Sequence, residues 1–271
     1  MNKVKAWDGV LPSLIQDRAR KPRQTGITMV LDRCHGLSAT EDLLELTGDY
    51  VDHIKLSFGT SVFLDDGLLR RKIEIIRERN IEIYPGGTLF EAAVFQGVCV
   101  PYMQRAHELG FTAVEISDGT LDLSPQFRAD AIRRALDLGL KVFTEVGKKD
   151  PAFQPSPAHL SEQIMLDLEF GADMVTVEAR ESGLRVGIYD EHGHIVEDRL
   201  DAILAGLNGV DRVLWETPLK YQQEYFVLRF GPNVNLGNIR PNDVLALEAL
   251  RCGLRWETFR KYVEQPERSG Y

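Results

Sequence analysis

Short apolar runs alternate with longer amphipathic stretches along most of the chain. Eight of these runs are rich in β-branched residues and have the length of buried strands. They are Gly26–Asp32, Val51–Ser57, Ile81–Tyr84, Ala113–Ser117, Lys141–Val146, Met174–Ala179, Val213–Glu216 and Asn233–Leu236. Between the second and third runs, the stretch Asp65–Asn80 carries Leu68, Leu69, Ile73 and Ile76 at helical spacing, which predicts a helix.

Two further helices have clear boundary signals. Ser124 and Pro125 fit an N-cap and a first helical position for a helix that runs to Leu138. The stretch Ser161–Phe170 reads as another helix and is followed by Gly171. Eight strands alternating with helices over about 250 residues predict a single (β/α)8 barrel. An open doubly wound sheet is the alternative, but no Gly-x-Gly-x-x-Gly follows the first strand, which disfavours its dinucleotide-binding version.

The chain, residues 1–271, is therefore expected to form one barrel domain with short extensions at both ends. The segment 181–195 is long for a barrel loop, and we interpret it as a small excursion over the barrel mouth. Its histidines, His192 and His194, flank Gly193 and fit a solvated turn better than a metal site.

Composition narrows the range of partners. The formal net charge is −9 and the pI is about 5.3, which argues against binding to nucleic acid or to an anionic membrane surface. The three cysteines form no Cys-x-x-Cys pair, as is usual in a reducing compartment. The first residues lack the apolar core of a signal peptide, and no apolar run reaches membrane-spanning length. These features predict a cytoplasmic protein.

Charged residues stand at or near the carboxyl ends of the predicted strands, where a barrel has its active site. They are Asp32, Lys55, Glu115, Glu145, Glu178 and Glu216. A buried charge costs several kcal/mol unless it is paired or bound to a metal, and carboxylates outnumber bases here. This excess indicates a hard divalent cation, Mg2+. A purely structural plug, in which Lys55 and Arg180 neutralise the glutamates, is the alternative.

Three loops have the composition of anion sites, because glycines let backbone amides approach an oxyanion and hydroxyls add donors. They are Ser57–Ser61 after the second strand, Tyr84–Thr88 after the third, and Leu236–Asn238 after the eighth. Three cations, Lys148, Lys149 and Arg180, lie near other strand ends. Together they predict a substrate with two or more negative charges. Lys55 could instead form a Schiff base, but the neighbouring carboxylates would keep its amine protonated.

Several longer motifs resemble the phosphosulfolactate synthase family. They are Gly48–Asp52 followed by Lys55 and Gly59–Ser61, then Tyr84–Glu91, Val114–Gly119, Thr144–Lys149, Glu178–Gly183, and Phe230–Ile239. The likeness runs from about Gly26 to Phe259. It departs from the family pattern after the first strand, where Asp32-Arg33-Cys34-His35-Gly36 replaces an expected Asp-Lys-Gly. Arginine and lysine are not equivalent where geometry is tight.

The resemblance implies a (β/α)8 barrel that adds sulfite to phosphoenolpyruvate and gives (2R)-phospho-3-sulfolactate, with Mg2+ as cofactor. It also implies a homo-oligomer, and a place in coenzyme M biosynthesis or in sulfolactate formation. Two alternatives stay open. One is another barrel lyase or aldolase that acts on a phosphorylated keto acid. The other is a non-catalytic, stress-associated relative, since plant members of the family are associated with heat tolerance.

The division of roles is a hypothesis built on the strand-end pattern. The metal ligands are expected to be Glu115, Glu145 and Glu178, with Asp32 and Glu216 in reserve. The catalytic set is Lys55 and Lys149, either of which could be the general acid, together with Glu145. The substrate-binding set is Arg180 and Lys148 for phosphate or sulfite, with Ser57, Gly87, Thr88, Asn235, Gly237 and Asn238.

Overall fold

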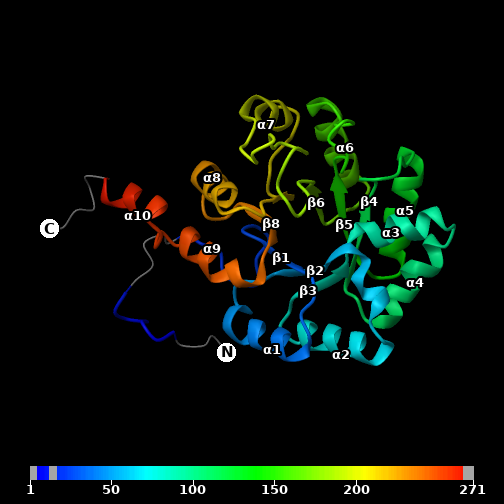
Figure 1. Ribbon diagram of the computed structural model, residues 1–271, viewed down its shortest axis with the longest axis horizontal. Coiled ribbons are helices and arrows are strands. Elements are labelled where there is room, and N and C mark those ends of the chain that lie inside the picture. Colours follow the sequence, from blue (N-terminus) through cyan, green and yellow to red (C-terminus); the bar gives the residue numbers. More distant parts are fainter. Residues whose placement is uncertain (1–4, 12–16, 265–271) are drawn as a thin grey trace.

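The computed structural model describes residues 5–11 and 17–264 (Figure 1). Eight parallel strands form one sheet in the order β3-β2-β1-β8-β7-β6-β5-β4. Their bounds are β1 Thr28–Asp32, β2 His53–Leu56, β3 Glu82–Pro85, β4 Ala113–Ser117, β5 Lys141–Val146, β6 Met174–Val177, β7 Val213–Glu216 and β8 Asn235–Ile239. The first and last strands pair with each other, and the helices lie outside the curled sheet (Figure 1). The predicted (β/α)8 barrel is confirmed.

The barrel is nearly, but not fully, closed by strand pairing. In the part of the chain that the structure describes, β3 and β4 are not joined by a strand ladder. They meet at their amino ends, where the Thr112 amide donates to the Ile83 carbonyl at 3.1 Å. The Ile83 amide donates in turn to Thr112 Oγ1 at 2.9 Å. Toward the carboxyl ends of the two strands, a side chain bridges the seam, because Glu115 of β4 accepts the amide of Gly87, which follows β3.

The helices connect the strands in the expected order, with additions. They are α1 Leu37–Thr47, α2 Asp66–Arg77, α3 Gly87–Phe95, α4 Cys99–Leu109, α5 Pro125–Asp137, α6 Pro157–Glu169, α7 Glu197–Leu204, α8 Lys220–Phe230, α9 Val244–Arg251 and α10 Trp256–Val263. The described residues also form two 3-10 helices, η1 Ser57–Phe63 and η2 Pro241–Asp243. The crossover from β3 to β4 holds two helices, α3 and α4, and α3 packs against β4.

Two helices begin with the same serine–proline signal. Ser124 Oγ accepts the Phe127 amide at the start of α5, and Ser156 Oγ accepts the His159 amide at the start of α6. The sequence prediction placed the start of α6 at Ser161 and is wrong by about one turn. Proline at the first helical position with serine before it marks the true boundary.

The prediction for the eighth strand is also wrong, and the error matters for the site. Gly237 and Asn238 lie inside β8 instead of following it. Gly237 pairs in register with Glu216 of β7. A Cβ at Gly237 would come within 2.3 Å of Leu214 Cδ2. This glycine therefore serves close packing inside the barrel, not the approach of a phosphate.

The interior of the barrel has an apolar floor beneath a charged layer. The floor is formed by Ile27, Met29, Tyr84, Ala113, Phe143, Met174 and Leu214. His53 of β2 stacks on Phe143 with ring centroids 4.5 Å apart. Lys55 follows two residues later on the same face, toward the carboxyl end. A larger apolar cluster fills the space between the strands and the surrounding helices.

The segment 181–195 between β6 and α7 contains one isolated antiparallel bridge, from Tyr189 to Ile195. Tyr189 is buried, and its hydroxyl donates to the Glu216 carbonyl at 2.7 Å. The segment is thus fixed to the end of β7. The extensions predicted at the two chain ends fall partly on residues 1–4, 12–16 and 265–271, outside the described residues. Within the described part, no helix is both long and apolar enough to cross a membrane.

Candidate active site

Lys55 lies at the centre of the charged layer. Its Nζ atom is 2.8 Å from Glu145 Oε2, 2.9 Å from Glu115 Oε2 and 3.3 Å from Glu216 Oε1. These residues belong to β2, β5, β4 and β7, so side chains from distant parts of the sheet converge on one ammonium group. All four side chains are at most 9% exposed. The strand-end prediction placed them together correctly.

Lys149 provides a second ammonium group nearer the solvent. It follows β5, and its Nζ atom lies 3.3 Å from Glu91 Oε1, 3.4 Å from Glu145 Oε1 and 3.7 Å from Glu178 Oε2. Its side chain is 30% exposed, while those of the three glutamates are at most 5% exposed. Glu145 therefore lies between the two lysines. The cluster contains five carboxylates and two ammonium groups.

Burial and mutual repulsion set the protonation of these groups. Burial raises the pKa of Glu115 to about 7 although Lys55 opposes the shift. Burial also raises the pKa of Glu178 well above its usual range, and repulsion from Glu145 adds to this. Burial would raise the pKa of Glu145 as well, but Lys55 and Lys149 hold it well below its usual range. For Lys55, burial opposes the charge, yet the surrounding glutamates raise its pKa.

Three of the carboxylates have the geometry of a cation site. Oxygen atoms of Glu145, Glu178 and Glu216 all lie within 4.8 Å of one another. Glu178 Oε2 is buried and accepts no hydrogen bond in the described structure, which is costly for a carboxylate oxygen. Hard oxygen ligands with surplus negative charge are what Mg2+ prefers. The residues present therefore fit a divalent cation.

Two other predicted metal ligands are held by different partners. Glu115 Oε2 accepts the Gly87 amide at 2.6 Å, in addition to its contact with Lys55. Asp32 Oδ2 lies 2.5 Å from Lys72 Nζ of α2, and its Oδ1 accepts the amides of Cys34 and His35. The structure therefore does not bring Asp32 into the group of three glutamates. Glu216, predicted only as a reserve ligand, belongs to it.

Of the cations predicted to bind anions, Arg180 is available to a ligand, whereas Lys148 is engaged within the protein. Arg180 is exposed, and its guanidinium has no ion-pair partner among the described residues. Its backbone has φ +60°, and its amide donates to Glu178 Oε1 at 2.5 Å. Lys148 Nζ instead donates to the carbonyls of Asp118 and Leu121, both at 2.6 Å. Lys148 therefore stabilises the loop that follows β4.

The predicted glycine and hydroxyl donors are mostly engaged within the protein. The Gly87 amide is bound to Glu115, and a Cβ at Gly87 would come within 2.4 Å of Ser117 Cβ. This glycine thus allows α3 to pack closely on β4. Ser57 Oγ donates to the Asp32 carbonyl at 3.0 Å. Thr88 is exposed in the first turn of α3.

The two asparagines of β8 lie at opposite ends of the strand. Asn235 lies at the amino end, where its Oδ1 accepts the Ile27 amide and its Nδ2 donates to the Asp211 and Val213 carbonyls. The structure therefore does not bring Asn235 to the mouth. Asn238 Nδ2 donates to the Arg180 carbonyl at 3.3 Å. Its Oδ1 is buried without a hydrogen-bond partner in the described structure.

The sequence analysis missed three buried helix residues that support the site. Glu91 of α3 binds Lys149, Lys72 of α2 binds Asp32, and Arg128 of α5 donates to the Glu145 carbonyl at 2.9 Å. Glu91 had a usable signal, because it is the only charged residue in the apolar helix Gly87–Phe95. Lys72 and Arg128 lie in helices with many charges and could not be singled out.

The loop that departs from the family pattern lies at the rim. Arg33 is exposed, and its guanidinium lies 3.3 Å from Glu181 Oε2 and over the ring of Phe58, 5.8 Å from the centroid. These contacts link the loops that follow β1, β2 and β6. Arg33 is therefore a rim residue and does not reach the buried glutamates.

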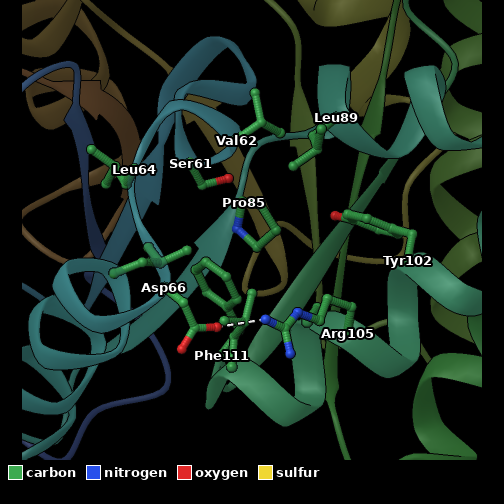
Figure 2. Close-up of a pocket in the computed structure, with 12 residues that line it drawn as sticks. Ser61, Val62, Leu64, Asp66, Pro85, Leu89, Tyr102, Arg105 and Phe111 are labelled. Atoms are coloured by element: carbon green, nitrogen blue, oxygen red, sulfur yellow. Dashed lines mark hydrogen bonds and ion pairs between the residues drawn. The ribbon is translucent and has the colours of Figure 1, made fainter.

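A separate cavity of about 310 Å3 lies between η1, α2 and α4 (Figure 2). Its lining is mainly apolar, and the charged residues Asp66 and Arg105 pair with each other at 2.5 Å. Tyr102 also lines it. An apolar space with its charges already paired does not suit a substrate with several negative charges, so the carboxylate cluster remains the candidate active site.

Comparisons with known proteins agree on one family. The sequence model of (2R)-phospho-3-sulfolactate synthase (ComA) matches residues 16–257. The chain is 44% identical to the phosphosulfolactate synthase of Methanothermobacter thermautotrophicus over 260 residues, which is 95% of this chain and 99% of the relative. It is 38% identical to the phosphosulfolactate synthase of Bacillus subtilis over 244 residues, covering 89% and 95% of the two chains.

Solved structures support the fold alone. The 3-hexulose-6-phosphate synthase from Salmonella typhimurium superimposes with a TM-score of 0.56 at 15% identity, covering 84% of this chain and 100% of the other.

Proposed function

Because the chain belongs to the (2R)-phospho-3-sulfolactate synthase family, we propose that its barrel mouth adds sulfite to phosphoenolpyruvate. The family match over nearly the whole barrel carries this proposal. In this proposal the carboxylate cluster around Lys55 and Lys149 would supply the chemistry that such an addition requires. The chain is thus an enzyme of the lyase type, which forms a carbon–sulfur bond.

The proposed reaction has two bond-forming steps. The sulfur lone pair of sulfite attacks C3 of phosphoenolpyruvate, and the carbon–carbon π electrons move onto C2 and the adjacent carboxylate. A proton donor then delivers a proton to C2, which creates the 2R centre. No oxidant or reductant is needed, and water restores the proton on the donor. The site must therefore stabilise a developing carboxylate charge and supply one proton from a fixed side.

Glu145, Glu178 and Glu216 would hold Mg2+ in this proposal, because their oxygens converge and Glu178 Oε2 accepts no hydrogen bond in the described structure. When bound, the cation would neutralise the charge that develops on the substrate carboxylate. Lys55 keeps Glu115, Glu145 and Glu216 close together by its three contacts. We assign it the role of ordering the carboxylates.

Lys149 is the proposed proton donor. Its ammonium group lies at the edge of the cluster and is partly exposed, whereas Lys55 is buried beneath the carboxylates. A donor at this edge can reach a substrate that enters from the mouth. Arg180, exposed and without an ion-pair partner in the described structure, is the proposed anchor for phosphate or sulfite. The proposed neutral donors are the Thr88 hydroxyl and the second hydrogen on Asn238 Nδ2, whose first hydrogen is donated to the Arg180 carbonyl.

The Schiff-base alternative has little support from the geometry. Three glutamates surround Lys55 and keep its amine protonated, and a protonated amine cannot attack a carbonyl. Trapping with borohydride in the presence of a phosphorylated keto acid tests this alternative directly. We expect no covalent adduct on Lys55.

The proposed function is tested by 31P NMR of the purified protein with phosphoenolpyruvate and sulfite. We expect a new phosphorus resonance that requires sulfite and Mg2+ and is absent with EDTA. Persistence of phosphoenolpyruvate with folded protein and excess Mg2+ would exclude sulfite addition. The non-catalytic alternative predicts this second result together with retained binding of anions. A cytoplasmic location and a homo-oligomer stay predictions.

A further inference from the structure

Glu91 occupies an unusual position for a charged residue. It lies in the middle of α3, whose other residues from Gly87 to Phe95 carry no charge, and it is only 4% exposed. A buried carboxylate needs compensating partners. The side chain of Glu91 has four such partners, which come from the ends of β4 and β5.

One oxygen of Glu91 holds the loop after β4. Glu91 Oε2 accepts the amides of Thr120 and Leu121 at 2.6 and 2.9 Å. Lys148 Nζ also holds this loop, because it donates to the carbonyls of Asp118 and Leu121. A carboxylate and an ammonium group from two different connections thus hold the segment 118–121.

The other oxygen of Glu91 holds Lys149. Glu91 Oε1 lies 3.3 Å from Lys149 Nζ and accepts the Ser117 hydroxyl at 3.2 Å. The other carboxylates near Lys149 are Glu145 and Glu178, and both belong to the proposed cation site. Without Glu91, the ion-pair partners left to Lys149 among the described residues would be the two cation-site carboxylates. Glu91 therefore opposes their attraction and keeps the ammonium group at the edge of the cluster.

We propose that Glu91 is a positioning residue that fixes the ammonium group of Lys149 and the adjacent 118–121 loop, so that C2 of the substrate receives its proton from one side. This inference rests on the proposed function, because it assumes that Lys149 is the proton donor. Glu91 itself touches no reacting atom. Its effect is carried by Lys149 and by the shape of the loop.

The test compares Glu91→Gln and Glu91→Ala with Glu82→Gln. The control breaks another glutamate–lysine pair, in which Glu82 Oε1 lies 2.8 Å from Lys141 Nζ at the amino end of the barrel. We expect kcat to fall by about 10-fold in Glu91→Gln and about 100-fold in Glu91→Ala, because small misplacement of a catalytic group is costly. The KM for phosphoenolpyruvate should change by less than about 3-fold. The control should keep wild-type kcat.

Product stereochemistry gives a readout that a merely structural role would not move. The wild-type protein should form only the 2R product, and the Glu91 variants should form a measurable 2S fraction. In a Lys149→Ala background, adding Glu91→Gln should lower kcat by less than about 2-fold, because residues that act as a unit are non-additive. A fully additive loss, or pure 2R product with wild-type kcat, overturns the inference.

Hydrogen exchange separates failure of this inference from failure of the proposed function. In Glu91→Ala, the amides of Thr120 and Leu121 should exchange at least about 10-fold faster, because they lose their acceptor. Unchanged exchange overturns the inference even if the wild-type protein is active. If the wild-type protein forms no product, the proposed function and the positioning role both fail, and faster exchange would then show a purely structural contact.

Discussion

At the scale of single residues, the site depends on an imbalance of charge in a buried space. Lys55 and Lys149 share Glu145, while burial, together with repulsion from Glu145 and Glu216, raises the pKa of Glu178. The positions of the carboxylates could be predicted, because alternate residues of a barrel strand point inward and the charges stand at strand ends. Among their helix partners, Glu91 could have been found as the only charged residue of the apolar helix α3. Lys72 could not, because it is one of many charged residues on α2 and its role depends on how that helix is rotated over the barrel.

Glu145→Gln tests the shared carboxylate. The substitution removes the charge that both ammonium groups contact, so we expect turnover to fall at least about 1,000-fold. The far-ultraviolet circular dichroism spectrum should remain that of the wild-type protein. Product formation can be followed by 31P NMR, with Glu82→Gln as a control that keeps activity. A fully active Glu145→Gln variant would remove Glu145 from the mechanism.

His53 predicts how stability depends on pH. Burial lowers its pKa from 6.5 to about 4. As the pH falls from 6.5 toward 4, the unfolded chain therefore binds a proton that the folded chain does not, and folding stability decreases. Between pH 7 and pH 5 the expected loss from this residue is about 2 kcal/mol.

His53→Gln should remove this part of the pH dependence. Urea denaturation at pH 7 and pH 5 measures the free energy of unfolding for both proteins. The wild-type protein should lose about 2 kcal/mol more than the variant over this interval. Equal losses in the two proteins would contradict a neutral, buried His53.

At the scale of elements, strands were easier to predict than their connections. β4, β5 and β7 have the predicted bounds, because buried parallel strands are nearly continuous apolar runs. β8 was misplaced because Gly237 reads as a turn residue, and only its pairing with β7 shows why a glycine is needed there. A local pattern does not contain such long-range contacts.

Arg128 couples α5 to its neighbours and gives a prediction at this scale. Its Nε atom donates to Asp167 of α6 at 2.8 Å, and its Nη2 donates to the Glu145 carbonyl at the end of β5. Arg128→Met leaves Asp167 buried without its cation, so the free energy of unfolding should fall by about 3–5 kcal/mol.

Arg133→Met provides the matched control, because Arg133 is on the same helix and its side chain is 61% exposed. Its pairing with Asp130 is worth at most about 1 kcal/mol. Urea denaturation of both variants separates the two cases. A loss below about 1 kcal/mol in Arg128→Met would show that the buried pair does not hold α5 in place.

At the scale of the whole molecule, an acidic protein with net charge −9 must accept anionic substrates. The ammonium groups of Lys55 and Lys149 offset part of the charge of the five carboxylates in the cluster, and the exposed Arg180 adds a positive charge at the rim. A cation bound to the glutamates would add to this local field. It would also bind only the folded chain, since unfolding separates strands that are distant in sequence.

Mg2+ should therefore raise the unfolding temperature of the whole protein. At a concentration of about 100 times its Kd, a ligand of the folded state adds about 2.7 kcal/mol, which corresponds to several degrees for a chain of this size. Differential scanning calorimetry with Mg2+ and with EDTA measures the shift. Glu178→Gln should lose most of it, and Glu82→Gln should keep it. If the unfolding temperature of the wild-type protein is the same with Mg2+ and with EDTA, the proposed cation site is wrong.

The seam between β3 and β4 is the part of the barrel where we expect unfolding to begin. Neighbouring strands elsewhere in the barrel are joined by ladders, whereas Glu115 bonded to Gly87, and Glu91 bonded to the 118–121 loop, span the upper part of this seam. Because β3 and β4 are not joined by a ladder in the described structure, we expect local opening of the barrel to begin along this seam. The residues that span it belong to the active-site cluster. The same few carboxylates thus hold the β3–β4 seam closed and keep the active-site residues in place.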